Sequence, residues 1–399
     1  MSPLVKERVP MSSPDLTEAE RRAVLEVLST PVLSMGKQTP AFEESVRKFS
    51  GAAHAIAVNS GTSGLHLCVR AAGFGAGDLV ITTPFSFIAS SNVLLYENAV
   101  PIFIDVDINT GNIDPSRLAE AVEQLLKGGK AAEKWLPRKG AIAKKPKGVL
   151  AVDVFGQPAD YDAITAIATE YDLLLIEDSC EALGAGYKGR QAGRFGQMAV
   201  YAFYPNKQIT TGEGGVIVTD DATAADFMRA LRNQGRAPED TWLQHTHLGY
   251  NYRLPELSAA LGRVQMERLN ELLAKREQVA AWYTERLKKV EQMEVQHLAD
   301  TTTRMSWFVY VIRLATQISR EKVAHLLMDA GIPTRPYFAP IHLQPFMVER
   351  FGYQPGDFPI VEDLGRRGLA LPFSSVMTEE QVDLVCNELK KAIPEALEK

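Results

Sequence analysis

The sequence has few cysteines and no long apolar run. Its three cysteines, Cys68, Cys180 and Cys386, lie far apart and form no CxxC pair, which excludes a disulfide framework and a cysteine metal site. No apolar stretch approaches the ~20 residues of a membrane-spanning helix. The first fifteen residues are too polar for a secretory signal. These absences predict a cytoplasmic protein with no metal and no membrane partner.

An excess of positive charge is also lacking. The formal net charge is −6, from 43 lysines and arginines against 49 acidic residues. Nucleic-acid-binding proteins carry a basic face, so we predict no nucleic-acid partner. One basic stretch, residues 127–147, separates an expected helix from an expected strand. We interpret it as a solvated connecting loop, with attraction of an anionic ligand as the alternative.

The sequence does contain a regular alternation of strands and helices. A first helix is predicted from Thr17 to Ser29, with Asp15 or Thr17 as its cap. From about Ala55, amphipathic helices such as GLHLCVRAAG and DYDAITAIATEY separate apolar strands. The strands are AIAVN, DLVITT, PIFIDVD, GVLAVDVF, DLLLIED, MAVYAF and GVIVT. This pattern predicts an α/β fold with a mostly parallel sheet, of the seven-stranded type, covered by helices on both faces.

The length and a change of pattern predict two domains. A chain of 399 residues exceeds the usual size of one hydrophobic core. Beyond Pro255, residues 256–290 predict one very long helix or two joined helices. The strand SWFVYVIRL and the helices SREKVAHLLMDAG and TEEQVDLVCNELKKAI follow. We predict a large domain over residues 1–250 and a smaller α+β domain over residues 251–399, which includes the long linking helix.

Three features follow strand ends, where open parallel sheets bind ligands. The turn Ser60-Gly61-Thr62-Ser63-Gly64 can offer free N–H groups to a phosphate, although a serine-capped strand–helix junction looks the same. Asp178 ends DLLLIED, and a buried acid there needs a cationic partner or several donors; a helix cap or ion pair is the alternative. Lys207, in FYPNKQITTGEGG, is placed to act as a nucleophile or is a surface lysine beside a turn.

Together the three features fit one cofactor. Pyridoxal phosphate needs an anion cradle for its phosphate and a lysine for its aldehyde. It also needs an acid that keeps the pyridine nitrogen protonated, so that the ring accepts electrons. The order of Thr62, Asp178 and Lys207 along the chain is one that an α/β sheet would bring to a single site. The residues therefore predict a pyridoxal phosphate site.

Longer motifs carry a family resemblance. They include VNSGTSGLHL, TPFSFIASSNVLLYENAVPIFIDVD, IEDSCEALGAGYKGRQAGRFG, AFYPNKQITTGEGGVIVT and LGYNYRLPELSAALGRVQMERL. With them the chain resembles the DegT/StrS family of pyridoxal-phosphate-dependent sugar aminotransferases, which have the aspartate-aminotransferase type I fold. The resemblance covers nearly the whole chain. It implies that Lys207 holds the cofactor as a Schiff base and that Asp178 contacts the pyridine nitrogen.

The resemblance also implies contacts for the rest of the cofactor. In the turn that Gly61 opens, the backbone N–H groups of Thr62 and Ser63 would hold the phosphate. Phe87 would stack on the ring, unless it is a plain core phenylalanine. Asn251 would reach the phosphate of the partner subunit, which implies a homodimer with shared active sites; otherwise it is a turn residue.

Two positions depart from the family pattern. Many relatives have a phosphate-binding serine five residues before the lysine, where this chain has Ala202. Many also have glutamine where this chain has Glu181, near the phenolic oxygen of the cofactor. An ionised Glu181 would repel the phenolate, so we expect it to be protonated, paired elsewhere or used to tune the bound cofactor. A surface acid just past the strand is the alternative.

The substrate is the least defined part. Lys37 and His342, the latter in PIHLQPF with Gln344, lie in segments that relatives place near the substrate entrance; ordinary loop positions are the alternative. The resemblance implies that L-glutamate donates the amino group and that a nucleotide-linked 3- or 4-keto-(6-deoxy) sugar accepts it. A cyclitol or another small keto compound as substrate, or a non-catalytic regulatory role, stays open. Relatives that dehydrate sugars replace the lysine with histidine, so Lys207 argues against that reaction.

Overall fold

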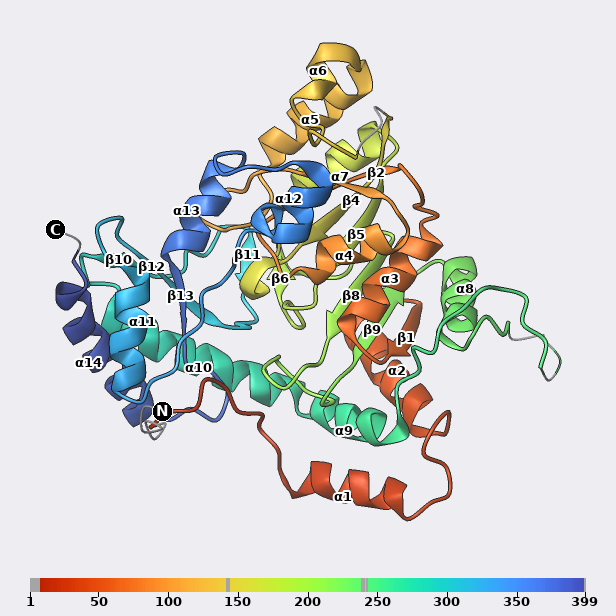
Figure 1. Ribbon diagram of the computed structural model, residues 1–399. Coiled ribbons are helices and arrows are strands. Elements are labelled where there is room, and N and C mark those ends of the chain that lie inside the picture. Colours follow the sequence, from red (N-terminus) through yellow and green to blue (C-terminus); the bar gives the residue numbers. More distant parts are fainter. Residues whose placement is uncertain (1–7, 141–143, 238–240, 242, 398–399) are drawn as a thin grey trace.

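A computed structural model describes residues 8–140, 144–237, 241 and 243–397 of the chain (Figure 1). The strands are β1 (His54–Val58), β2 (Leu79–Thr82), β3 (Val100–Phe103), β4 (Pro146–Val152), β5 (Leu174–Asp178), β6 (Gly186–Tyr187), β7 (Arg190–Gln191), β8 (Met198–Ala202), β9 (Gly215–Thr219), β10 (Met293–Glu294), β11 (Thr302–Arg304), β12 (Tyr310–Leu314) and β13 (Gly368–Leu371). The α-helices are α1 (Glu18–Leu28), α2 (Gln38–Ser50), α3 (Gly61–Ala71), α4 (Ala89–Tyr96), α5 (Pro115–Lys127), α6 (Gly129–Glu133), α7 (Tyr161–Glu170), α8 (Ala222–Arg232), α9 (Glu256–Glu267), α10 (Leu269–Leu287), α11 (Arg320–Asp329), α12 (Pro345–Phe351), α13 (Pro359–Arg367) and α14 (Glu379–Glu395). Two short 3₁₀ helices, η1 (Val154–Gly156) and η2 (Ile341–Leu343), complete the elements.

Within the described residues, seven strands form the central sheet, in the order β1-β9-β8-β5-β4-β2-β3. The pairs β2–β3, β2–β4, β4–β5 and β5–β8 are parallel. Strand β9 runs antiparallel to both of its neighbours, β1 and β8. The mostly parallel α/β sheet that the sequence predicts is therefore confirmed.

Helices cover both faces of this sheet because its strand residues alternate between two apolar layers. On one face, residues such as Ile56 and Ile176 pack with apolar side chains of α3, α4 and α8. On the other face, Val149 and Leu175 pack with α5 and α7, and Ala57 packs with α2 and α9. Burial on both faces explains why the strands are apolar throughout.

The segment after residue 255 begins with two helices rather than one. Helix α9 ends and α10 begins at Arg268, whose backbone (φ −96°, ψ 1°) leaves the helical range. The Arg268 side chain binds Asp15 and Glu20, which come from the N-terminal segment beside it. Helix α10 then leads to a second sheet, β10-β12-β13, beside α11 and α14 (Figure 1). The domain boundary near residue 250 stays a prediction.

The structure bears on two local expectations, the start of the first helix and the basic stretch. Helix α1 begins after Thr17, which forms a capping box with Glu20. The basic stretch 127–147 contains the short helix α6, and residues 141–143 lie outside the described part. In that stretch Lys134 pairs with Glu120, Arg138 with Asp357 and Lys147 with Asp78. These pairings favour the connecting-loop interpretation over attraction of an anionic ligand.

The described residues lack two kinds of feature. No helix there is long and apolar enough to cross a membrane. No group of three or more His, Cys, Asp or Glu side chains there is arranged to hold a metal ion.

Candidate active site

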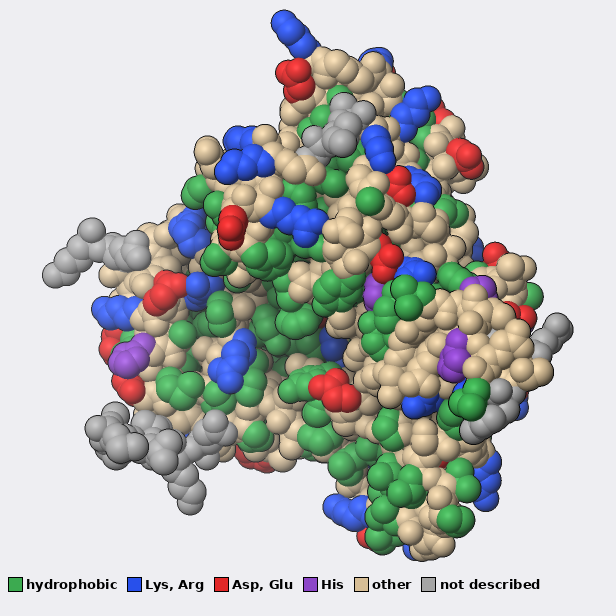
Figure 2. Space-filling view, turned by 45° about the vertical axis from the view of Figure 1, so that its right-hand side comes forward, with side chains coloured by type: hydrophobic (Ala, Val, Ile, Leu, Met, Phe, Trp, Pro, Cys, Tyr) green, Lys and Arg blue, Asp and Glu red, His purple; other side chains and the backbone are tan. Residues whose placement is uncertain are grey.

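A pocket of about 770 Å³ lies where several strands of the central sheet end. Its floor contains the first turn of α3, Asp178 at the end of β5, and Lys207 in the loop between β8 and β9. Phe308 and Tyr337, from the C-terminal part of the chain, form the opposite wall. In a space-filling view, a hollow near the middle of one face is rimmed mainly by hydrophobic side chains (Figure 2). The structure thus brings the three sequence features into one pocket.

The first turn of α3 presents backbone donors to this pocket. The Ser60 hydroxyl caps the helix and accepts the N–H of Ser63 at 3.0 Å. The expected contact of the Ser63 N–H with a phosphate therefore competes with this cap. Helix geometry leaves the N–H groups of Gly61 and Thr62 without partners in the helix, where the helix dipole favours an anion.

Glycines allow this turn to pack tightly against its neighbours. A Cβ on Gly61 would lie 2.7 Å from the Cβ of Ala202, and one on Gly215 would lie 2.8 Å from the carbonyl oxygen of Ser60. Ala202 itself lines the pocket and contributes no hydroxyl. The cradle is therefore built from main-chain donors, with alanine where many relatives have serine.

Lys207 is held between a carboxylate and an aromatic ring. Its Nζ lies 3.5 Å from Oε1 of Glu181 and 3.7 Å from the centre of the Phe308 ring. Glu181 is buried, and its Oε2 also accepts the N–H of Phe155 at 2.9 Å. Burial raises the pKa of Glu181, whereas the Lys207 ammonium and the Phe155 N–H oppose that shift. Glu181 is thus a paired acid facing the pocket and not a surface acid.

Asp178 is buried at the bottom of the pocket. One of its carboxylate oxygens accepts the hydroxyl of Ser90 at 2.6 Å, and the other accepts the N–H of Cys180 at 3.3 Å. Neighbouring Cys180 also lines the pocket, and burial raises the pKa of its thiol well above the usual range. Among the described residues no lysine or arginine lies within ion-pair distance of Asp178. Its negative charge is available to a cation in the pocket.

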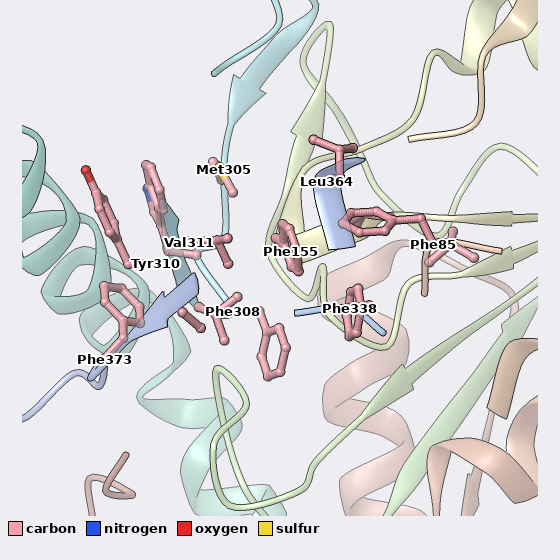
Figure 3. Close-up of a cluster of buried hydrophobic side chains, with 14 of the residues drawn as sticks. Phe85, Phe155, Met305, Phe308, Tyr310, Val311, Phe338, Leu364 and Phe373 are labelled. Carbon is pink, nitrogen blue, oxygen red and sulfur yellow. The ribbon is translucent and has the colours of Figure 1, made fainter. Parts of the chain in front are cut away.

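Aromatic side chains form the walls. Phe87 and Tyr204 line the pocket at its mouth, and Phe87 is 63% exposed. Deeper in, Phe338 packs on Phe155 with ring centres 5.1 Å apart, and Figure 3 shows this pair beside Phe85. Phe87 is therefore a surface-facing ring and not a core phenylalanine, as stacking on a flat ligand requires.

These residues fit the cofactor that the sequence predicts. The pocket offers main-chain donors for a phosphate, an amine for an aldehyde, and an acid for a ring nitrogen. The chemistry of this donor set matches what pyridoxal phosphate requires. The residues that carry these groups are buried or half-buried and line the same cavity, which supports the fit.

Three expected site residues lie outside the pocket lining. Asn251 is exposed, and its main chain adjoins Asn59, which does line the pocket. Lys37 is exposed just before α2, and substrate contact by it stays a prediction.

His342 lies away from the pocket and is fully buried. Its Nε2 lies 3.0 Å from Oε1 of Glu362, and its ring packs on Phe358. Burial lowers the pKa of His342. Gln344 directly precedes α12, makes no side-chain cap hydrogen bond there, and does not line the pocket either. The structure favours the alternative for both residues, namely ordinary positions in a packed loop.

Sequence reasoning missed several residues that the structure brings to the pocket. They are Asn59, Ser86, Tyr204, Asn206, Glu213, Phe308, Tyr337 and Phe338. Ser90 was also missed; it does not line the pocket but donates its hydroxyl to Asp178, which does. Ser90 lies in the motif TPFSFIASSNVLLYENAVPIFIDVD, one helical turn after Phe87. That spacing could have indicated a place close to the site. For Phe308 and Tyr337 the spacing along the chain offers no signal, because they reach the pocket only through tertiary packing.

Comparison with known proteins identifies the family of this chain. The DegT/DnrJ/EryC1/StrS aminotransferase family matches residues 14–390. The GDP-perosamine synthase of Caulobacter vibrioides is 36% identical over 390 residues, which cover 97% of this chain and 98% of that protein. A protein of Geobacillus stearothermophilus named pleiotropic regulatory protein is 33% identical over 371 residues, 92% of each chain. The solved structure of Helicobacter pylori PseC, an aminotransferase involved in the biosynthesis of pseudoaminic acid, has a TM-score of 0.86 at 28% identity and covers 98% of this chain and 100% of that one.

Proposed function

Because the chain belongs to the DegT/DnrJ/EryC1/StrS aminotransferase family, we propose that it moves an amino group from L-glutamate to a ketone carbon of a nucleotide-linked 3- or 4-keto-(6-deoxy) sugar. The family match confirms the resemblance carried by the sequence motifs, and the protein is a pyridoxal-phosphate-dependent aminotransferase. Support for a sugar substrate comes from the names of its relatives, the GDP-perosamine synthase above all.

The observation that carries the proposal is the convergence of Lys207, Asp178 and the first turn of α3 on one pocket. Bound pyridoxal phosphate supplies an aldehyde that links to amines and a ring that withdraws electrons from the reacting carbon. The N–H groups of Gly61 and Thr62 would bind its phosphate, and Phe87 would cover one face of its ring. Asp178 would face the ring nitrogen and favour a proton there.

Lys207 carries out the chemical steps that belong to the protein. Its Nζ would hold the cofactor through the aldehyde. With the amino donor bound, the free amine of Lys207 would act as a positioned general base that takes up and returns a proton. The same role in the opposite direction would serve the amination of the sugar ketone. The Phe308 ring and Glu181 hold the amine in place between these steps.

The test of the proposed substrate uses the protein loaded with pyridoxamine phosphate. It is mixed with a panel of keto sugar nucleotides, a cyclitol ketone and small keto acids, and mass spectrometry identifies which compound gains the amino group. Amination of a 3- or 4-keto sugar nucleotide is the expected result. Amination of the cyclitol or keto acid alone would contradict the sugar proposal. Failure of the half-reaction with glutamate would favour a regulatory protein, the role that the name of one relative suggests.

Glu181 should tune the protonation of the cofactor linkage. Its carboxylate, 3.5 Å from Lys207 Nζ, stabilises a proton on that nitrogen. In Glu181→Gln we expect the pH midpoint of the visible absorption band of the bound cofactor to fall by roughly one unit. Glu170→Gln, a change at an exposed acid of α7, serves as the control. A midpoint equal to that of the wild type would show that Glu181 does not act on this nitrogen.

We propose further that the protein is a homodimer with shared active sites. Asn251 is exposed beside the pocket, and large apolar side chains are exposed near it in sequence, including Leu248 at 81%. Others lie on and after α1, namely Leu25, Leu28, Val32, Leu33 and Met35. In the space-filling view hydrophobic side chains gather on the lobe at the bottom, the height at which α1 lies (Figures 1 and 2). Such exposure supports an interface with a second copy.

Mixing two inactive variants tests the shared site. Asn251→Asp brings a negative charge toward the phosphate and should weaken cofactor retention, and Lys207→Ala removes the amine. A mixed dimer would gather both defects in one site and leave the other site intact. Unfolded and refolded as an equal mixture, the two variants should regain about a quarter of wild-type activity. Activity no higher than that of the parents, or an active monomer in sedimentation, would disprove the shared site.

A further inference from the structure

Arg276, in α10, carries a buried charge without an acid partner. Its side chain is only 2% exposed, and no carboxylate in the described part of the chain lies within ion-pair distance. Burial alone lowers its pKa to about 10. A buried guanidinium costs free energy unless hydrogen bonds compensate for lost water. The position of Arg276 therefore calls for an explanation beyond filling space, which an apolar side chain could do.

The guanidinium joins two segments that are far apart in sequence. One nitrogen, Nη1, donates to the carbonyl oxygens of Trp307 at 3.0 Å and Phe308 at 3.3 Å. The other, Nη2, donates to those of Asn206 at 2.9 Å and Lys207 at 2.5 Å. The planar fork of arginine suits this arrangement, and lysine cannot reproduce it.

Gln208, the residue after Lys207, links the same two segments. Its Nε2 donates to the carbonyl oxygen of Glu181 at 2.6 Å and to the hydroxyl of Ser306 at 2.9 Å. Ser306 in turn donates to the Glu181 carbonyl at 3.2 Å. Gln208 and Ser306 are 98 residues apart in the chain. Hydrogen bonds thus fix the backbone on both sides of the Lys207 side chain.

The segment held in this way carries the ring beneath the amine. Phe308 lies two residues before β12, and its ring centre is 3.7 Å from Lys207 Nζ. In Figure 3 the Phe308 ring lies between the Tyr310–Phe373 group and the Phe155–Phe338 group. It stacks on Tyr337, with ring centres 6.2 Å apart, and Tyr337 stacks on Phe338. Aromatic packing thus supports the ring, whereas the hydrogen bonds from Arg276 hold its backbone.

We propose that Arg276 and Gln208 form a clasp that positions Lys207 against Phe308, so that the amine meets the cofactor in one orientation. The inference rests on the proposed role of Lys207 as the lysine that binds the cofactor. Neither Arg276 nor Gln208 has its side chain among the groups that would touch the cofactor, so both are positioning residues. Loss of the clasp should slow the reaction of the lysine more than it weakens binding of the substrate.

The test measures how fast Lys207 captures the cofactor. Apoprotein is mixed with pyridoxal phosphate, samples are reduced with borohydride at intervals, and the label on the Lys207 peptide is quantified. Arg276→Lys keeps the charge but cannot form all four hydrogen bonds of the guanidinium. We expect the rate of labelling and kcat each to fall roughly tenfold. KM for glutamate should change less than about threefold, and the pH midpoint of the visible band should shift. The matched control is Arg286→Lys, on the same helix but paired with Asp383 and Glu379 at the surface.

The second variant, Gln208→Ala, leaves every guanidinium bond intact and covers the case in which Arg276→Lys does not fold. Labelling is expected to slow at least about threefold. The clasp is overturned if the variants that fold melt at a lower temperature but keep the labelling rate and the band midpoint of the wild type. Arg276 and Gln208 would then have a purely structural role. If borohydride labels a lysine other than Lys207 in the wild type, the proposed function itself fails. That outcome is distinct from failure of the clasp.

Discussion

Lys207→Ala is expected to lower the rate of transamination on the order of 10⁴-fold, since in the proposed mechanism it removes both the covalent anchor and the general base. Among the residues that line the pocket in the described structure, Lys207 is the one lysine. The variant should still bind pyridoxal phosphate, because the first turn of α3 and Asp178 remain. Borohydride reduction followed by peptide mapping should label Lys207 in the wild type and leave the variant unlabelled.

Lys188→Ala is the control for this variant. Lys188 is exposed, pairs with Asp162 and lies outside the pocket lining, so its loss should leave turnover and labelling unchanged. The circular dichroism spectrum and the melting temperature of Lys207→Ala should match those of the wild type. The Lys207 side chain contacts Glu181 and Phe308, and we expect the fold to tolerate the loss of both contacts. Labelling of another lysine in the wild type, or substantial turnover without Lys207, would refute the assignment.

Asp178→Ala should reduce turnover by about 10²–10³-fold, the usual cost of removing a group that stabilises transition-state charge. Without the carboxylate the ring nitrogen loses its proton, and the ring becomes a poor acceptor of electrons. The protein should remain folded, because the two groups that donate to Asp178 are a serine hydroxyl and one N–H. Turnover is measured under saturating cofactor, so that weaker binding is not mistaken for slower chemistry.

Asp153→Asn offers a matched comparison in the same sheet. Asp153 directly follows β4, is fully buried with its pKa raised by burial to about 6, and accepts bonds from Ser179 and Tyr161. It does not line the pocket. We expect this variant to melt at a lower temperature yet keep most of its turnover. Near-normal turnover in a folded Asp178→Ala would remove Asp178 from its proposed role.

The order of strands and helices could be predicted because it depends on local pattern. Apolar runs bounded by turns located the seven strands of the main sheet, and Thr17 located the start of α1. Helix α2 escaped prediction because it begins after Lys37, which offers no side-chain cap, and buries few apolar residues, chiefly Phe42 and Val46. The break at Arg268 was left open by the sequence, since its partners Asp15 and Glu20 come from the other end of the chain.

The sequence by itself determined the chemistry of the site. A Gly-Thr-Ser turn, an acid and a lysine, each at the end of a strand or a few residues after one, meet at one edge when those strands run in the same direction in a single sheet. Local periodicity sets this arrangement of strand ends. The longer sequence motifs then indicated the family. Only the tertiary structure decided what surrounds Lys207. Arg276 reaches its backbone from α10, Phe308 reaches its amine from the segment before β12, and Glu181 turns inward to pair with it. Such contacts depend on how distant segments pack and on where a buried charge can find hydrogen-bond partners, and spacing along the chain encodes neither.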